Sequence, residues 1–155
     1  MDIFGVLRRD HIRARAFADR LAGGEESMPG ESLDRLREEW EIHAKVEEKF
    51  LFPSLQSDPR IRGLTVRTRL EHARIRALFV ELEAQAQGRK IPGLGPARVA
   101  ALREALAGLT ALEEDGLYRR AARILGAEEA EAMGCEVEDF REELLLLYGL
   151  AATSL

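Results

Sequence analysis

The sequence contains a single cysteine, Cys135, and so cannot form an intrachain disulfide. This scarcity is typical of proteins from a reducing compartment, and we expect a cytoplasmic location. No apolar run near the first residue is long enough for a signal peptide, so we expect no secretory leader.

Long hydrophobic runs and an excess of basic charge are also lacking. The apolar stretch at 143–152 is well short of the roughly 20 residues that a membrane span needs. The net charge is −5, with 23 basic and 28 acidic residues, and offers no basic surface for nucleic acid or anionic lipid. We therefore expect neither nucleic acid nor a membrane as a partner.

What the sequence does have is the composition of one soluble helical domain. Hydrophobic residues make up 46% of the 155 residues and charged residues 33%, enough for a core without cross-links. Apolar residues recur at steps of three and four, and no segment alternates as a strand would. The pattern predicts long helices over about 1–22, 32–55, 59–88 and 96–125.

Capping residues and helix breakers indicate where these helices begin and end. Gly23 is expected to end the first helix. Ser32 is expected to cap the start of the second helix, and Pro53 is expected to bend or end its last turn. Asp58 and Pro59 are expected to open the third helix, as cap and first-turn residue.

Four helices with short connections favour an all-α fold, an antiparallel up-down four-helix bundle. We expect residues 1–125 to form this bundle. Residues 126–155 are expected to pack on the same domain as an appendage of short extra helices, at about 127–133 and 136–148.

A weak internal repeat supports the bundle. Residues 10–16 resemble residues 71–77, and the Glu-Glu pair that follows His43 has a counterpart after Leu109. The first two helices and the last two therefore look like two copies of one hairpin.

Five polar residues interrupt the apolar faces of the predicted helices. Two of them, His43 and Glu47, lie one turn apart, and burying such a pair without a partner costs roughly several kcal/mol. A bound cation is such a partner, because neutral imidazole and ionised carboxylate are both ligands for first-row metals. Counted from the expected turns, the five lie at one depth of the bundle and are expected to converge: His11, His43, Glu47, His72 and Glu113.

Other residues near these positions are assigned ordinary roles. Glu48, Glu71 and Glu114 lie about 100° around the helix from the inward face and are expected in solvent. Asp10 is expected either in solvent or in contact with a metal-binding residue, without binding the metal itself. Trp40 and Tyr118 are expected to pack in the core.

This set of residues resembles the hemerythrin-like family, the HHE cation-binding domains. The resemblance covers about residues 1–125 and rests on Asp10-His11, His43-x-x-x-Glu47-Glu48 with the following Leu-Phe-Pro53, Glu71-His72 and Glu113-Glu114. It implies a four-helix bundle with a non-haem di-iron centre. It also implies terminal ligands at His11, His43 and His72, and bridging carboxylates at Glu47 and Glu113.

One departure from the family pattern lies in the fourth helix, where Leu109 stands at the usual histidine position. One metal then keeps His11, His43 and both bridges, whereas the second keeps His72 and the bridges. The residue four after His72 is Arg76, which offers no replacement. One or two iron ions are therefore both consistent with the sequence, and zinc or manganese could substitute.

Three functions remain open on this evidence. The leading interpretation is a non-haem iron protein that binds or responds to a small ligand such as O₂, peroxide or nitric oxide, or that handles iron. The second is a di-iron oxidase or peroxidase on the same centre, and no catalytic residue is predicted for it. The third is a degenerate bundle that binds no metal and acts through protein contacts.

Overall fold

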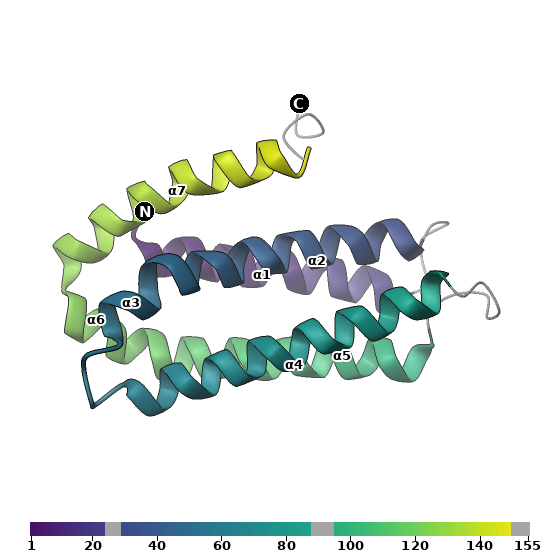
Figure 1. Ribbon diagram of the computed structural model, residues 1–155, viewed down its shortest axis with the longest axis horizontal. Coiled ribbons are helices and arrows are strands. Elements are labelled where there is room, and N and C mark those ends of the chain that lie inside the picture. Colours follow the sequence, from purple (N-terminus) through teal and green to yellow (C-terminus); the bar gives the residue numbers. More distant parts are fainter. Residues whose placement is uncertain (24–28, 88–94, 150–155) are drawn as a thin grey trace.

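The computed structural model describes residues 1–23, 29–87 and 95–149, and within them the chain forms helices and turns with no strand. Consecutive long helices run in opposite directions and close into a four-helix bundle, as predicted (Figure 1). The elements are α1 (Ile3–Gly23), α2 (Pro29–Val46), η1 (Glu47–Leu51), α3 (Phe52–Leu55), α4 (Arg62–Gln87), α5 (Pro96–Ala111), η2 (Leu112–Leu117), α6 (Tyr118–Leu125) and α7 (Ala127–Leu147). None of these described helices has the length and apolar character needed to cross a membrane.

The buried apolar residues form two clusters, one toward each end of the bundle. One cluster includes Leu7 and Leu117, and the other includes Ala18 and Leu109. The polar positions of α1 and η2 fall between these pairs along the chain. The apolar faces thus hold the helices together on either side of a short polar layer, and that layer positions the candidate site.

The inward face of the second helical segment shifts after Glu47. The buried residues are then Leu51 and Leu55, whereas an unbroken α-helical period from His43 and Glu47 would place Phe50 and Ser54 inward, and both are only half-buried. The physical reason is η1, a π-helical turn whose hydrogen bonds span five residues, so that one extra residue enters the turn.

The two glutamates of the polar layer, Glu47 and Glu113, both lie at such π-helical turns. The amide of Phe52 donates to the carbonyl of Glu47, and the amide of Tyr118 donates to the carbonyl of Glu113. Pro53 accounts for the first turn in part, because it has no amide hydrogen for an α-helical bond. The second turn contains no proline, so proline alone does not cause these turns.

Two helix starts differ from the prediction. α2 begins at Pro29, a residue favoured in a first turn, so Ser32 is a buried residue inside the helix and not its cap. α4 begins at Arg62, later than predicted. Asp58 instead accepts the amide of Arg60 at 2.9 Å, in the turn that precedes the helix.

The C-terminal segment forms one helix, α7, so the prediction of two short helices was wrong. The expected break lay at Gly134, which is inside α7 where this helix meets the first residues of the chain. A Cβ at Gly134 would overlap the main-chain carbonyl of Met1. The glycine therefore permits a close backbone approach. Beyond it, α7 lies along α1 and α2 (Figure 1).

We expect Gly134→Ala to destabilise the protein by about 1–3 kcal/mol, because the backbone of α7 must move away from Met1 and Asp2. Urea unfolding measures this change. Gly108→Ala is the matched control, since no atom lies within 4 Å of the added Cβ in α5. It should stabilise by up to about 1 kcal/mol. Equal stabilisation by both changes would contradict the close packing of α7 on the N-terminus.

Candidate metal centre

All five polar residues singled out in the sequence are buried and meet in the middle of the bundle. Glu47, His72 and Glu113 are 0% exposed, His43 is 3% exposed and His11 is 9% exposed. They come from five different elements, namely η1, α4, η2, α2 and α1. The structure thus brings together every residue of the predicted set.

Glu113 lies at the centre of this cluster. Its Oε2 is 2.7 Å from His11 Nε2 and 3.3 Å from His43 Nε2, and its Oε1 is 3.4 Å from His72 Nε2. Glu113 belongs to two groups of possible metal ligands, and within each group the donor atoms all lie within 4.8 Å of one another. One group is His11, His43 and Glu113, and the other is Glu47, His72 and Glu113. One carboxylate can therefore serve two neighbouring cation positions.

Glu47 provides a test of whether a cation fits. Its Oε2 is 3.0 Å from His72 Nε2 and 3.7 Å from His43 Nε2. Among the described residues, this buried oxygen has no partner with hydrogen-bond geometry. Ligands of one first-row metal, bound at about 2.1 Å, lie roughly 3–4 Å apart. The donor set therefore fits a metal ion.

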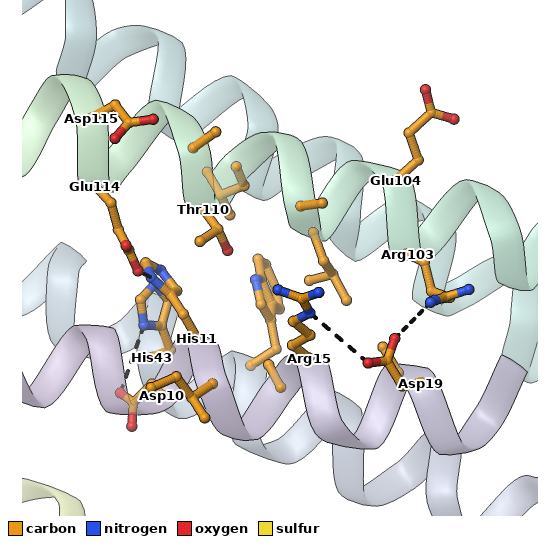
Figure 2. Close-up of a pocket in the computed structure, with 18 of the residues that line it drawn as sticks. Asp10, His11, Arg15, Asp19, His43, Arg103, Glu104, Thr110, Glu114 and Asp115 are labelled. Carbon is orange, nitrogen blue, oxygen red and sulfur yellow. Dashed lines mark hydrogen bonds and ion pairs between the residues drawn. The ribbon is translucent and has the colours of Figure 1, made fainter. Parts of the chain in front are cut away.

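Each histidine turns its other ring nitrogen, Nδ1, toward a further carboxylate. The pairs are His11 with Glu114 at 2.7 Å, His72 with Glu48 at 3.4 Å, and His43 with Asp10 at 3.6 Å. Figure 2 shows the first and the last of them. Metal-binding histidines are commonly oriented in this way by a carboxylate behind the ring.

These contacts correct the expectation that Glu48 and Glu114 lie in solvent. Their side chains are only 34% and 33% exposed, and each contacts a histidine. The sequence did contain a signal for both, because each directly follows one of the buried glutamates in the repeated Glu-Glu pair.

Asp10 is the most enclosed of these outer carboxylates. It is 2% exposed, and its Oδ2 accepts a 2.6 Å hydrogen bond from Nη1 of Arg141, which is 3% exposed. Arg141 belongs to α7, outside the four bundle helices, and the sequence analysis missed it. A helix beyond the bundle is thereby connected through Asp10 to His43.

Tyr118 is buried in the core as expected, but it also contacts the site, a role that the sequence analysis did not assign to it. Its hydroxyl donates to Glu47 Oε1 at 2.7 Å and lies 3.1 Å from Glu113 Oε2. Its ring stacks on His11, with centroids 5.8 Å apart. In the internal repeat Tyr118 corresponds to Phe52, so the added hydroxyl was the available signal.

Comparison with known proteins identifies the family. Residues 2–121 match the family described as Hemerythrin HHE cation binding domain.

The chain belongs to the hemerythrin HHE family. No curated protein and no solved structure gives a significant match. The matched residues include all five residues of the candidate metal centre, and Arg141 lies beyond them.

The pKa values of His43, His72 and Glu113 in this hemerythrin-family site are strongly shifted. Burial disfavours a charged imidazole, yet the Glu47 and Asp10 carboxylates raise the pKa of His43 to about 10. Burial likewise opposes the charge of His72, but Glu113 and Glu47 raise its pKa to about 11. Burial also opposes ionisation of Glu113, whereas hydrogen bonds from the histidines hold its pKa well below its usual range. A metal must therefore displace protons from the histidines when it binds.

These shifts predict how the metal-free protein responds to pH. Both histidines have a pKa raised above the ordinary 6.5, so their contribution to stability is complete below pH 6.5 and is lost as pH rises through about 10 and 11. We expect the Tm in the presence of a chelator to fall by on the order of 10 °C between about pH 6 and pH 11. A His43→Gln/His72→Gln variant should show a flatter profile. A Tm that rises with pH over this range would contradict the ion pairing.

Proposed function

We propose that this protein binds non-haem iron, as one or two ions, and uses it to bind or respond to O₂, peroxide or nitric oxide. The observation that carries the proposal is Glu113, whose two carboxylate oxygens face separate buried histidine groups. Three nitrogens and two carboxylates, with no thiolate among them, suit iron, manganese or zinc.

The first ion would be held by His11, His43 and Glu113, and the second by Glu47, His72 and Glu113. Three residues per group leave coordination positions for an outside ligand. Bound iron would supply the redox chemistry and the position where a small ligand attaches. The residues of this chain supply the rest: the carboxylates behind the histidines orient the rings, and the Tyr118 hydroxyl donates a hydrogen bond to Glu47.

The second group is the poorer in nitrogen donors, with one histidine where the first group has two. Leu109 occupies the position at which the family resemblance implies a histidine, and it is buried. Arg76 does not compensate, because its guanidinium is paired with Glu41 at 2.9 Å and with Glu48 at 3.1 Å. This shortage supports a second ion that is held less tightly than the first.

A second candidate, an oxidase or peroxidase on the same centre, is favoured by one observation. A cavity of about 750 Å³ reaches His11 and His43 from the surface. A centre that took only diatomic ligands would not need a space of this size. The retained donor set argues against the third interpretation, a bundle without metal.

Metal analysis of the purified protein tests the proposal. We expect about one to two irons per chain after growth in iron-supplemented medium, since the site offers two donor groups. Nitric oxide added to the reduced protein should change the visible spectrum. A protein that carries no metal as purified, and that binds no Fe²⁺ in an anaerobic titration, would refute the proposed function.

A further inference from the structure

The cavity beside the candidate metal centre lies between α1 and α5 and has a volume of about 750 Å³. Figure 2 shows Asp10, His11 and His43 together at one end of it. Arg15 and Asp19 lie toward the other end, together with Arg103 and Glu104 of α5. The cavity thus extends along the two helices from the donor atoms to the protein surface.

Small side chains on both helices account for this hollow. Ala14 and Ala18 of α1 face Ala107 and Ala111 of α5 across it. Leu109 contributes an apolar wall where a family histidine would have placed a polar ring. The same substitution that removes a metal donor therefore makes the inner cavity more apolar.

The size of the cavity indicates the size of its occupant. Pockets that bind small organic molecules measure roughly 300–1,000 Å³. A water molecule occupies roughly 30 Å³ of the liquid, and O₂ or nitric oxide is of similar size. The cavity therefore suits an organic molecule and is far larger than a diatomic ligand requires.

The lining indicates the polarity of the occupant. The buried walls are apolar and include Trp40, Leu106 and Leu109. At the rim, Asp19 pairs with Arg103 at 2.7 Å and with Arg15 at 3.9 Å, so the two cations share one carboxylate. Rim residues such as Glu104 and Asp115 add negative charge. A neutral molecule fits this lining better than an anion does.

One buried hydrogen-bond donor in the wall has no acceptor. Trp40 is 2% exposed, and within the part of the chain that the structure describes its indole N–H has no hydrogen-bond partner. That nitrogen is covered by protein atoms and is closed to a water molecule, so Trp40 offers the cavity the apolar part of its ring and no polar contact. This agrees with an occupant that is largely apolar.

We propose that this cavity binds a neutral, largely apolar organic molecule and holds it against His11 and His43. The walls and Trp40 provide the binding, so binding does not require a metal. Only the consequence that the molecule lies beside a redox-active ion depends on the proposed function.

The single tryptophan makes the proposal testable by fluorescence. The probe is 6-propionyl-2-(dimethylamino)naphthalene, a neutral naphthyl ketone whose emission shifts to the blue on leaving water. With the full chain, both metal-free and iron-loaded, we expect a saturable blue shift and quenching of Trp40 emission. Phenylalanine in the cavity, as Ala14→Phe or at the exposed Ala107 as Ala107→Phe, should weaken binding by at least about tenfold.

Ala77→Phe is the matched control, because Ala77 is exposed on α4 and does not line the cavity. It should bind the probe as the parent does. No saturable shift with the parent, or undiminished binding by both cavity variants, would overturn the inference. Probe binding by a protein that takes up no iron would support the inference while refuting the proposed function, so the two failures are distinguishable.

Discussion

Glu113→Gln is expected to abolish binding at both metal positions. Glu113 is the one residue shared by the two donor groups found in the described chain, and it faces all three histidines. An amide offers one weak oxygen donor and cannot carry the negative charge. Mutation of a residue that only supports a metal ligand lowers metal affinity by about 10–100-fold. Loss of a ligand shared by two ions should therefore lower metal affinity by more than about 100-fold.

Metal content and Fe²⁺ titration measure this effect. His72→Ala should remove one ion at most, since His72 belongs to one group only. Glu81→Gln, at an exposed glutamate of α4, is the matched control and should keep the parent's metal content. A Glu113→Gln protein that retains full metal would show that Glu113 is not the shared ligand.

Arg141→Met is expected to destabilise the protein by about 3–5 kcal/mol, because it leaves a buried carboxylate unpaired. Arg141 and Asp10 are 3% and 2% exposed and are joined by a 2.6 Å hydrogen bond. At about 2–4 °C per kcal/mol, the Tm should fall by roughly 6–20 °C. Adding Asp10→Asn should recover part of this loss, because the unpaired charge is then removed.

Arg9→Met is the matched control for Arg141→Met. Arg9 also pairs with an acidic residue of α7, Glu138, but the two side chains are 38% and 41% exposed. Its removal should cost less than about 1 kcal/mol. Since Asp10 lies 3.6 Å from His43 Nδ1, Arg141→Met should also weaken iron binding by about tenfold. Equal effects of the two variants on stability would show that the Arg141 pair is not enclosed as described.

Much of the fold and of the candidate site follows from local sequence. Side chains at steps of three and four share one face of an α-helix, which was enough to place His11, His43 and His72 inward. The rise of about 1.5 Å per residue gives the depth of each residue in an antiparallel bundle. His11, Glu47 and Glu113 could therefore be predicted to meet although they lie far apart in the chain.

The π-helical turns were not predictable in this way. A regular period assumes one hydrogen-bond pattern throughout, and the extra residue of η1 moves the buried face from Phe50 to Leu51. Similarly, Gly134 is a helix breaker in sequence terms. In the structure it lies inside α7, where the backbone of Met1 packs too closely to leave room for a Cβ.

Contacts between remote side chains were decided by the tertiary structure alone. Spacing along a helix determines a residue's depth and approximate direction, but not which atom of a neighbouring helix its polar tip reaches. Asp10 and Arg141 are 131 residues apart, and Tyr118 reaches Glu47 across 71 residues. Those contacts, and the cavity along α1 and α5, depend on interhelical distances that the packed side chains of several helices set together.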